Sequence, residues 1–69
     1  MKPVAVIILN WNGAKLLRKY LPTVLAGTNA DIADVIVADN GSTDDSIAVL
    51  EQEFPQVKVL RRFSWGWHV

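Results

Sequence analysis

The sequence predicts an α/β fold in which three parallel strands alternate with two helices, in the order β-α-β-α-β. Short apolar runs rich in β-branched residues recur along the chain, and segments with apolar residues three and four positions apart separate them. Gly, Pro and Asn residues mark the junctions. Strands and helices that alternate in this way are typical of a parallel sheet with right-handed crossovers.

The first strand and the first helix are expected near the N-terminus. Residues 4–9, VAVIIL, form a continuous apolar run, which is typical of a strand buried on both faces of a parallel sheet. After the polar segment NWNG at 10–13, apolar residues recur at helical spacing and predict a helix. These residues are Leu16, Leu17, Tyr20, Leu21, Val24 and Leu25. Pro22 is expected to end, kink or restart that helix, and Gly27 to stop it.

The second half of the chain repeats the pattern. Residues 34–38, DVIVA, predict a second buried strand. The Ser-Thr-Asp triplet at 42–44 is suited to cap a helix N-terminus, and the apolar residues of 47–54 supply one side of that helix. Pro55 closes it, and residues 57–60, VKVL, predict the third strand.

Composition limits the chain to one small domain. It has 69 residues, no Cys, 51% hydrophobic residues and a formal net charge of zero. A disulfide or a thiolate metal site is therefore impossible, and disorder is not expected. All seven acidic residues lie between Asp31 and Glu53 and no basic stripe exists, so nucleic acid is not an expected partner. The longest apolar run, residues 3–9, is too short to span a membrane.

Two polar loops follow the first and second predicted strands, at 10–13 and 39–43. The carboxyl ends of parallel strands meet at one edge of the sheet, which is where ligands of open α/β sheets bind. There the carboxylate of Asp39 can accept a hydrogen bond from a ribose hydroxyl or a base N–H. The Asn-Gly pair that follows favours a tight turn, and the Ser-Thr pair after it can cap the second helix. A turn and a helix cap alone would also explain these residue types.

The segments VAVIILNWNGAKLLRKYLPTVL and DVIVADNGSTDDSIAVLEQEFPQVKVL are similar to the start of the family 2 glycosyltransferases, inverting enzymes with the GT-A fold. The resemblance covers residues 4–60. It implies that residues 1–61 are the N-terminal, Rossmann-like half of a GT-A domain, which binds a nucleotide-sugar donor of the UDP or dTDP type. The residues that it places at the donor are Leu9, Asn10 and Asn12, against the nucleotide, Asp39, at the uracil or ribose, and Asn40, Gly41 and Ser42, in the turn that shapes the pocket.

Other parts of the family pattern are missing from this sequence. The resemblance implies a divalent metal, Mg²⁺ or Mn²⁺, held by an Asp-x-Asp motif on a later strand, and a later acid as catalytic base. No Asp or Glu follows Glu53. Residues 62–69 form an atypical aromatic tail, such as a truncated or frame-shifted end would give, whose Trp65, Trp67 and His68 are expected to pack rather than to form a site. The expected function is a donor-binding fragment that does not transfer sugar alone.

Two other functions are weighed against this one. A non-catalytic interaction module would self-associate through an exposed sheet edge, which open strands favour. A dinucleotide-dependent oxidoreductase is disfavoured, because only Gly13 stands where a G-x-G-x-x-G fingerprint is required. The resemblance also implies a cytoplasmic location, with full-length relatives peripheral to the inner face of a membrane.

Overall fold

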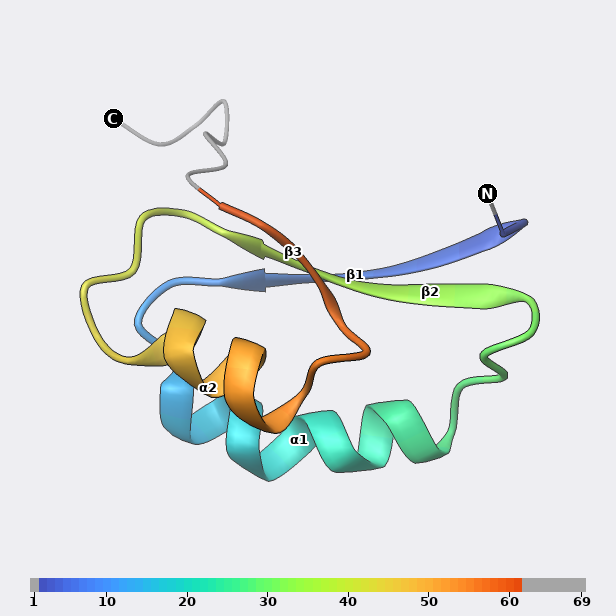
Figure 1. Ribbon diagram of the computed structural model, residues 1–69, viewed down its shortest axis with the longest axis horizontal. Helices are drawn as coiled ribbons and strands as arrows, with labels where there is room; N and C mark the ends of the chain where they lie inside the picture. Colours follow the sequence, from blue (N-terminus) through green and yellow to red (C-terminus); the bar gives the residue numbers. More distant parts are fainter. Residues whose placement is uncertain (1, 62–69) are drawn as a thin grey trace.

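A three-stranded parallel sheet forms one layer of the protein in a computed structural model that describes residues 2–61 (Figure 1). The strands are β1 (Val4–Asn10), β2 (Ala33–Asp39) and β3 (Lys58–Leu60), with β2 in the middle. The helices are α1 (Ala14–Ala26) and α2 (Ser46–Glu53). The predicted order and strand direction are confirmed. The expected tail at 62–69, with Trp65, Trp67 and His68, lies outside the described residues.

The register of the sheet brings the carboxyl ends of its two long strands level with each other. β1 and β2 pair over their full length, from Val4 opposite Ala33 to Asn10 opposite Asp39. β3 is shorter and pairs with β2 only from Ile36 to Ala38. The last residues of β1 and β2 are therefore direct neighbours, and the loops that follow them start side by side.

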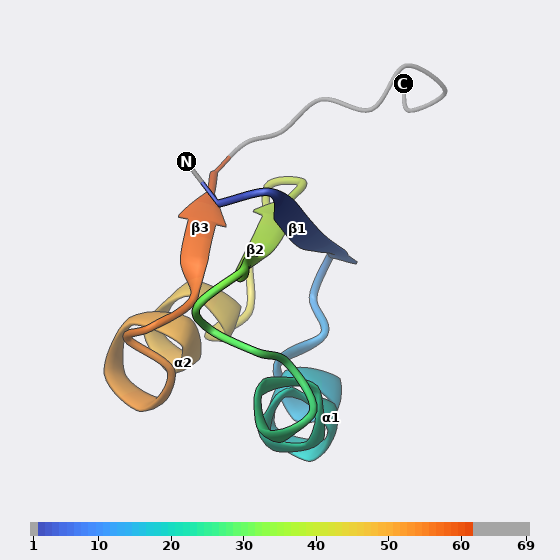
Figure 2. The same ribbon diagram turned by 90° about the vertical axis from the view of Figure 1, so that its right-hand side faces the viewer.

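Both helices cover the same face of the sheet, as the end view shows (Figure 2). Side chains alternate between the two faces of a strand. The face toward the helices holds the hydrophobic core, which consists of Ala14, Leu17, Leu21, Val35, Val37, Val49, Leu50, Phe54 and Val57. On the other face Ile7, Leu9 and Leu60 are 59%, 55% and 49% exposed. The prediction that the first strand is buried on both faces is therefore wrong, because right-handed crossovers place both helices on one side. The central strand β2 has no exposed residue, as predicted, and Ala38 on its open face is 1% exposed.

Helix α1 runs through Pro22 without a break, so the expectation that this proline ends or restarts the helix is wrong. Leu21 is 1% exposed, and Val24 and Leu25 beyond the proline pack against the same core. This burial on both sides of Pro22 outweighs the one backbone hydrogen bond that its missing N–H removes. Gly27 ends the helix as expected, with its N–H donating to the Thr23 carbonyl at 3.0 Å.

Helix α2 begins at Ser46, later than the Ser-Thr pair that was expected to cap it. Ser42 bonds to other loop residues instead, and the capping bond comes from Asp44, whose Oδ1 accepts the Ser46 N–H at 2.9 Å. The helix ends before Pro55, as predicted. None of the helices in residues 2–61 is long and apolar enough to cross a membrane.

Candidate functional site

The candidate site is the edge of the sheet where β1 and β2 end, which we call the carboxyl rim and define as residues 9–13 and 39–44. The ladder between the strands continues one step into the loops, because the Asn40 N–H donates to the Asn10 carbonyl at 3.0 Å. Both loops then turn toward the helix layer (Figure 1). Hydrogen bonds between side chains and backbone join one loop to the other.

Asp39 is the centre of these bonds and is 2% exposed. Its Oδ1 accepts hydrogen bonds from Asn10 Nδ2 at 2.8 Å and from Ser42 Oγ at 2.6 Å, and its Oδ2 accepts the Ser42 N–H at 2.8 Å. Burial by itself raises the pKa of this carboxyl, but the bonds from Ser42, Asn10 and the Gly41 amide outweigh it, so the pKa of Asp39 lies below its ordinary value. The side chain is held as a carboxylate.

Asn12 makes a second connection between the loops. Its Oδ1 accepts the backbone N–H groups of Thr43 at 2.7 Å and of Asp44 at 3.1 Å. Its own N–H donates to Ser42 Oγ at 2.8 Å, and the same oxygen lies 3.2 Å from Asn10 Nδ2. Ser42 therefore joins both asparagines to Asp39.

Asp44 serves the N-termini of both helices. Its Oδ2 accepts the Ala14 N–H at the start of α1 at 3.1 Å, while its Oδ1 accepts the Ser46 N–H. Negative charge is favourable at a helix N-terminus, where backbone N–H groups lack partners. Burial by itself raises the pKa of Asp44. The bonds from the Ser46 hydroxyl, the Ser46 amide and the Ala14 amide lower it by more, so the pKa of Asp44 lies below its ordinary value. Of the Ser-Thr-Asp triplet that was expected to cap the second helix, it is therefore Asp44 that caps α2.

Two glycines of the rim have different reasons for lacking a side chain. A Cβ at Gly13 would lie 2.6 Å from Asn10 Oδ1, so the loop can close over Asn10 only with glycine there. Gly41 has a φ of 77°, a conformation that favours glycine, and a Cβ there would meet nothing within 4 Å. The backbone at Gly41 is therefore open to a ligand.

The structure brings all seven expected site residues to one edge but gives them different surroundings. Asn10 and Asp39 are buried, Asn40 and Ser42 are half-buried, and Asn12 and Gly41 are exposed. Leu9 is exposed on the open face of the sheet rather than in the loops. Whether each of them contacts a nucleotide stays a prediction.

Three cavities adjoin the rim, and two of them add residues that sequence reasoning did not predict as site residues. One, of about 250 Å³, lies along β1 and α1 and includes Trp11 and Tyr20. The other, of about 370 Å³, lies beside β2 and includes Asp39, Gly41 and Arg61. Trp11 is 62% exposed, and an aromatic residue between two asparagines in a loop was the signal that could have found it.

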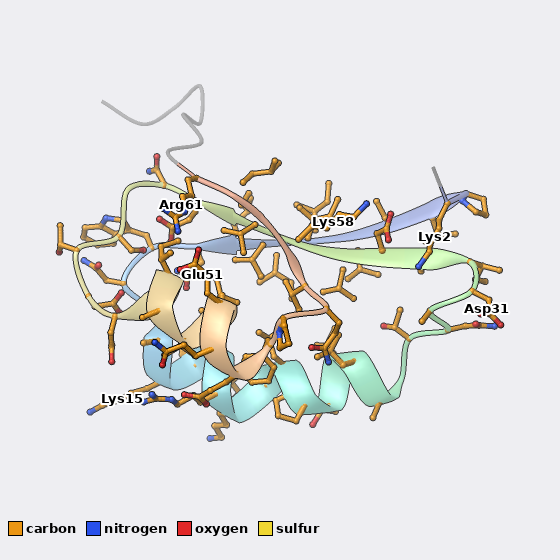
Figure 3. The ribbon with its side chains drawn as sticks, in the orientation of Figure 1. Lys2, Lys15, Asp31, Glu51, Lys58 and Arg61 are labelled. Atoms are coloured by element: carbon orange, nitrogen blue, oxygen red, sulfur yellow. The ribbon has the colours of Figure 1, made fainter. Side chains whose placement is uncertain are left out.

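Arg61, directly after β3, forms an ion pair with Glu51 of α2, and Figure 3 shows the two side chains together.

The described residues do not fit the divalent metal that the resemblance implies. Within residues 2–61, no three His, Asp or Glu side chains come close enough to hold a metal ion. Asp39 and Asp44 already accept bonds from N–H and O–H donors.

Comparisons with known proteins identify the family. A family model described as "Glycosyl transferase family 2" matches residues 5–68. A protein of Nostoc sp. (strain PCC 7120), described as an uncharacterized glycosyltransferase, is 43% identical over 49 residues, which are 71% of this chain. The chain spans about 15% of the length of that relative. No solved structure matches the chain. Because the family model matches nearly all of it, the chain belongs to glycosyl transferase family 2.

Proposed function

We propose that the carboxyl rim is the nucleoside-binding part of a donor site, and that its ligand is the UDP or dTDP portion of a nucleotide-sugar. The observation that carries the proposal is the joining of the two loops by Asp39, Asn10 and Ser42 at the edge where open α/β sheets bind ligands. Family membership supports a sugar nucleotide over other nucleotides. The residues at the donor are those expected from the resemblance.

The bonded loops supply a fixed platform, and the exposed groups around it supply the contacts. Asp39 also lines the larger cavity, and its Oδ2 accepts one hydrogen bond from a side chain or loop amide, so we expect the remaining lone pair of that oxygen to accept from a base N–H or a ribose hydroxyl. Trp11 offers an indole face on which a base can stack, and stacking tolerates any base. Gly41 lets the ligand approach the backbone closely.

We assign binding, and not sugar transfer, to this chain. Inverting transfer requires a carboxylate that removes the acceptor proton while the hydroxyl attacks the anomeric carbon. In residues 2–61 the buried carboxylate of Asp39 and the exposed carboxylate of Asp44 are engaged in loop and capping bonds, and no metal-binding group is present. We therefore expect the isolated chain to release no UDP from UDP-sugar, Mn²⁺ and a saccharide acceptor above the rate without protein.

An amide NMR titration of the chain with UDP tests the proposal. Chemical shifts that change at residues 10–13 and 39–43, but not at the opposite end of the sheet near Asn29, would support it. Trp11→Ala should weaken UDP binding, whereas Trp11→Phe, which keeps an aromatic face at the same position, is the matched control and should weaken it less. Unchanged shifts at the rim at millimolar UDP would overturn the proposal. A selective response to NADH instead would indicate a dinucleotide-binding domain.

A second candidate function, self-association, is favoured by a separate observation. Strand β1 is at the edge of the sheet, and Ile7 and Leu9 on its open face are more than half exposed. Exposed edges and apolar faces of this kind pair with other chains. Sedimentation velocity from micromolar to submillimolar concentration tests it. A dimer that grows with concentration is expected, and one monomeric species throughout would contradict it.

A further inference from the structure

Asn12 contacts the loop before α2 through one side-chain oxygen and is otherwise exposed. Its Oδ1 accepts two successive backbone N–H groups, of Thr43 and Asp44, that come more than thirty residues later in the chain. Neither N–H has a regular secondary-structure partner, since both precede the first residue of α2. The side chain of Asn12 thus takes the place that a backbone carbonyl would fill in a sheet or a helix.

The backbone of Asn12 is adapted to this contact. Its φ is 52°, which makes it the one non-glycine residue in a left-handed conformation within residues 2–61. Asparagine tolerates that region better than most residues, but the conformation still needs surrounding contacts to persist. The two bonds at Oδ1 and the bond from the Asn12 N–H to Ser42 are those contacts.

The loop that Asn12 holds forms one wall of the larger cavity. Gly41, Ser42 and Thr43 line that cavity together with Asp39, Ile47 and Arg61. Asp39 and Asn10 fix the loop where it leaves β2, whereas Asn12 fixes it farther along, at Thr43 and Asp44. Without the Asn12 bonds, the N–H groups of Thr43 and Asp44 lose their acceptor, and beyond Ser42 the loop is held by the Asp44 side chain alone, through Ala14 and Ser46.

We infer that Asn12 is a positioning residue for the nucleotide: it sets the shape of the 41–44 loop through Oδ1 and does not need to contact the ligand. This role rests on the proposed function, and it differs from the direct contact expected from the resemblance. It makes the acceptor oxygen the essential group of Asn12 and the Nδ2 amino group dispensable.

Three variants separate these groups. Asn12→Asp keeps an acceptor oxygen and removes the amino group, Asn12→Gly removes the acceptor but tolerates the positive φ, and Asn12→Ala removes the acceptor and adds strain. The readouts are amide hydrogen exchange at Thr43 and Asp44 without ligand, and the Kd for UDP from the NMR titration. Asn29→Gly is the control, because Asn29 Oδ1 accepts the Asp31 N–H at 2.9 Å at the opposite end of the sheet.

Asn12→Gly and Asn12→Ala are expected to speed exchange at Thr43 and Asp44 and to raise the Kd about tenfold, as the loss of two hydrogen bonds implies. Asn12→Asp keeps an oxygen that accepts the N–H groups of Thr43 and Asp44, so the Kd of this variant should stay within about threefold of the wild-type value. Asn29→Gly should speed exchange at Asp31 alone. The inference is overturned if Asn12→Asp loses UDP as Asn12→Gly does while loop exchange stays slow, because the amino group would then be the ligand contact.

The two proposals fail in different ways. If the wild-type chain does not bind UDP, the proposed function is wrong and so is a positioning role toward this ligand. Exchange at Thr43 and Asp44 would still show whether Asn12 holds the loop. If UDP binds and Asn12→Gly leaves both the Kd and the exchange unchanged, the donor site stands and the positioning role is wrong.

Discussion

The carboxyl rim and the open sheet face are made by the same strands and differ in how their side chains are satisfied. At the rim, Asp39 and Asn10 are buried, Ser42 is half-buried, and their polar atoms are bonded to one another. On the open face, Ile7 and Leu9 are more than half exposed. Both helices lie on the opposite side of the sheet (Figure 2). The rim is complete within residues 2–61, whereas the open face has apolar surface that another layer would bury.

This difference shows that a polar loop pair can be the more self-sufficient part of a small α/β unit. Hydrogen bonds at the rim are made between groups only a few residues beyond the paired strand ends, so forming the sheet already brings them together. Apolar burial requires a partner surface of similar size. A three-stranded sheet with two helices supplies such a surface on one face only.

The largest expected effect comes from removing the central carboxylate of the rim. Asp39→Ala leaves Asn10 Nδ2 and the Ser42 N–H and hydroxyl without their acceptor in a buried place. Buried donors without partners cost about 1–3 kcal/mol each, and partial rehydration limits the sum, so we expect a loss of about 3 kcal/mol in the free energy of unfolding. Urea denaturation followed by circular dichroism measures it.

The matched control is Asp45→Ala, an exposed aspartate two positions before Ile47 that makes no side-chain capping bond to α2. It should change the free energy of unfolding by less than about 0.5 kcal/mol. Equal losses for the two alanine variants would mean that the bonds at Asp39 add no stability and that the rim is no more fixed than an ordinary loop.

Much of the fold could be predicted from the sequence because the signals are local. The runs at 4–9 and 34–38 and the helical spacing between them need no knowledge of the partner segments. Which residues of the first run lie on the open face could not be predicted, because Ile7 and Ile8 look alike until the positions of both helices are known. Pro22 was misjudged for a similar reason, since the burial around it depends on the sheet below.

The candidate site divides in the same way. Its location follows from strand ends in a parallel sheet, and the sequence alone predicts Asp39, Asn10 and Ser42 as members of the site. The bonds from Asn12 to Thr43 and Asp44 join residues more than thirty positions apart, and no local pattern announces them. The cap of α2 was misplaced because Ser42 is engaged by Asp39.

A smaller effect than that of Asp39→Ala is expected when the free energy of unfolding is measured as a function of pH. The pKa of Asp39 is lowered in the folded state, so its contribution to stability is present above the pKa of the unfolded chain and lost as pH falls through the folded value. The free energy of unfolding should be nearly constant from pH 7 to 5 and decrease below about pH 4. Urea denaturation at each pH measures this, and Asp39→Asn should reduce the slope.

High salt distinguishes the contribution of Asp39 to this pH dependence from the contribution of Asp34. Hydrogen bonds with Lys58 and Lys2 also lower the pKa of Asp34, against the opposing effect of burial, but these partners are exposed cations. Salt screens such pairs, whereas the donors at Asp39 are neutral groups. The part of the acid effect due to Asp39 should therefore persist in 1 M NaCl, a condition with a Debye length of about 3 Å. Its disappearance in salt would contradict the assignment to the rim.

The smallest loss of stability is expected from Ile7→Thr on the open face, and a matched substitution in the core serves as the reference. Ile7 is 59% exposed and Val37, on the helix-covered face, is fully buried, so Val37→Thr is the same kind of change in the core. Val37→Thr buries a hydroxyl and should cost about 1–3 kcal/mol. Ile7→Thr should cost less than about 0.5 kcal/mol in a dilute sample.

If the open face pairs with a second copy, Ile7→Thr will also lower the melting temperature at high concentration and remove its dependence on concentration. A wild-type melting temperature that does not change with concentration, together with a cost for Ile7→Thr as large as that for Val37→Thr, would show that the open face is already covered within the single chain.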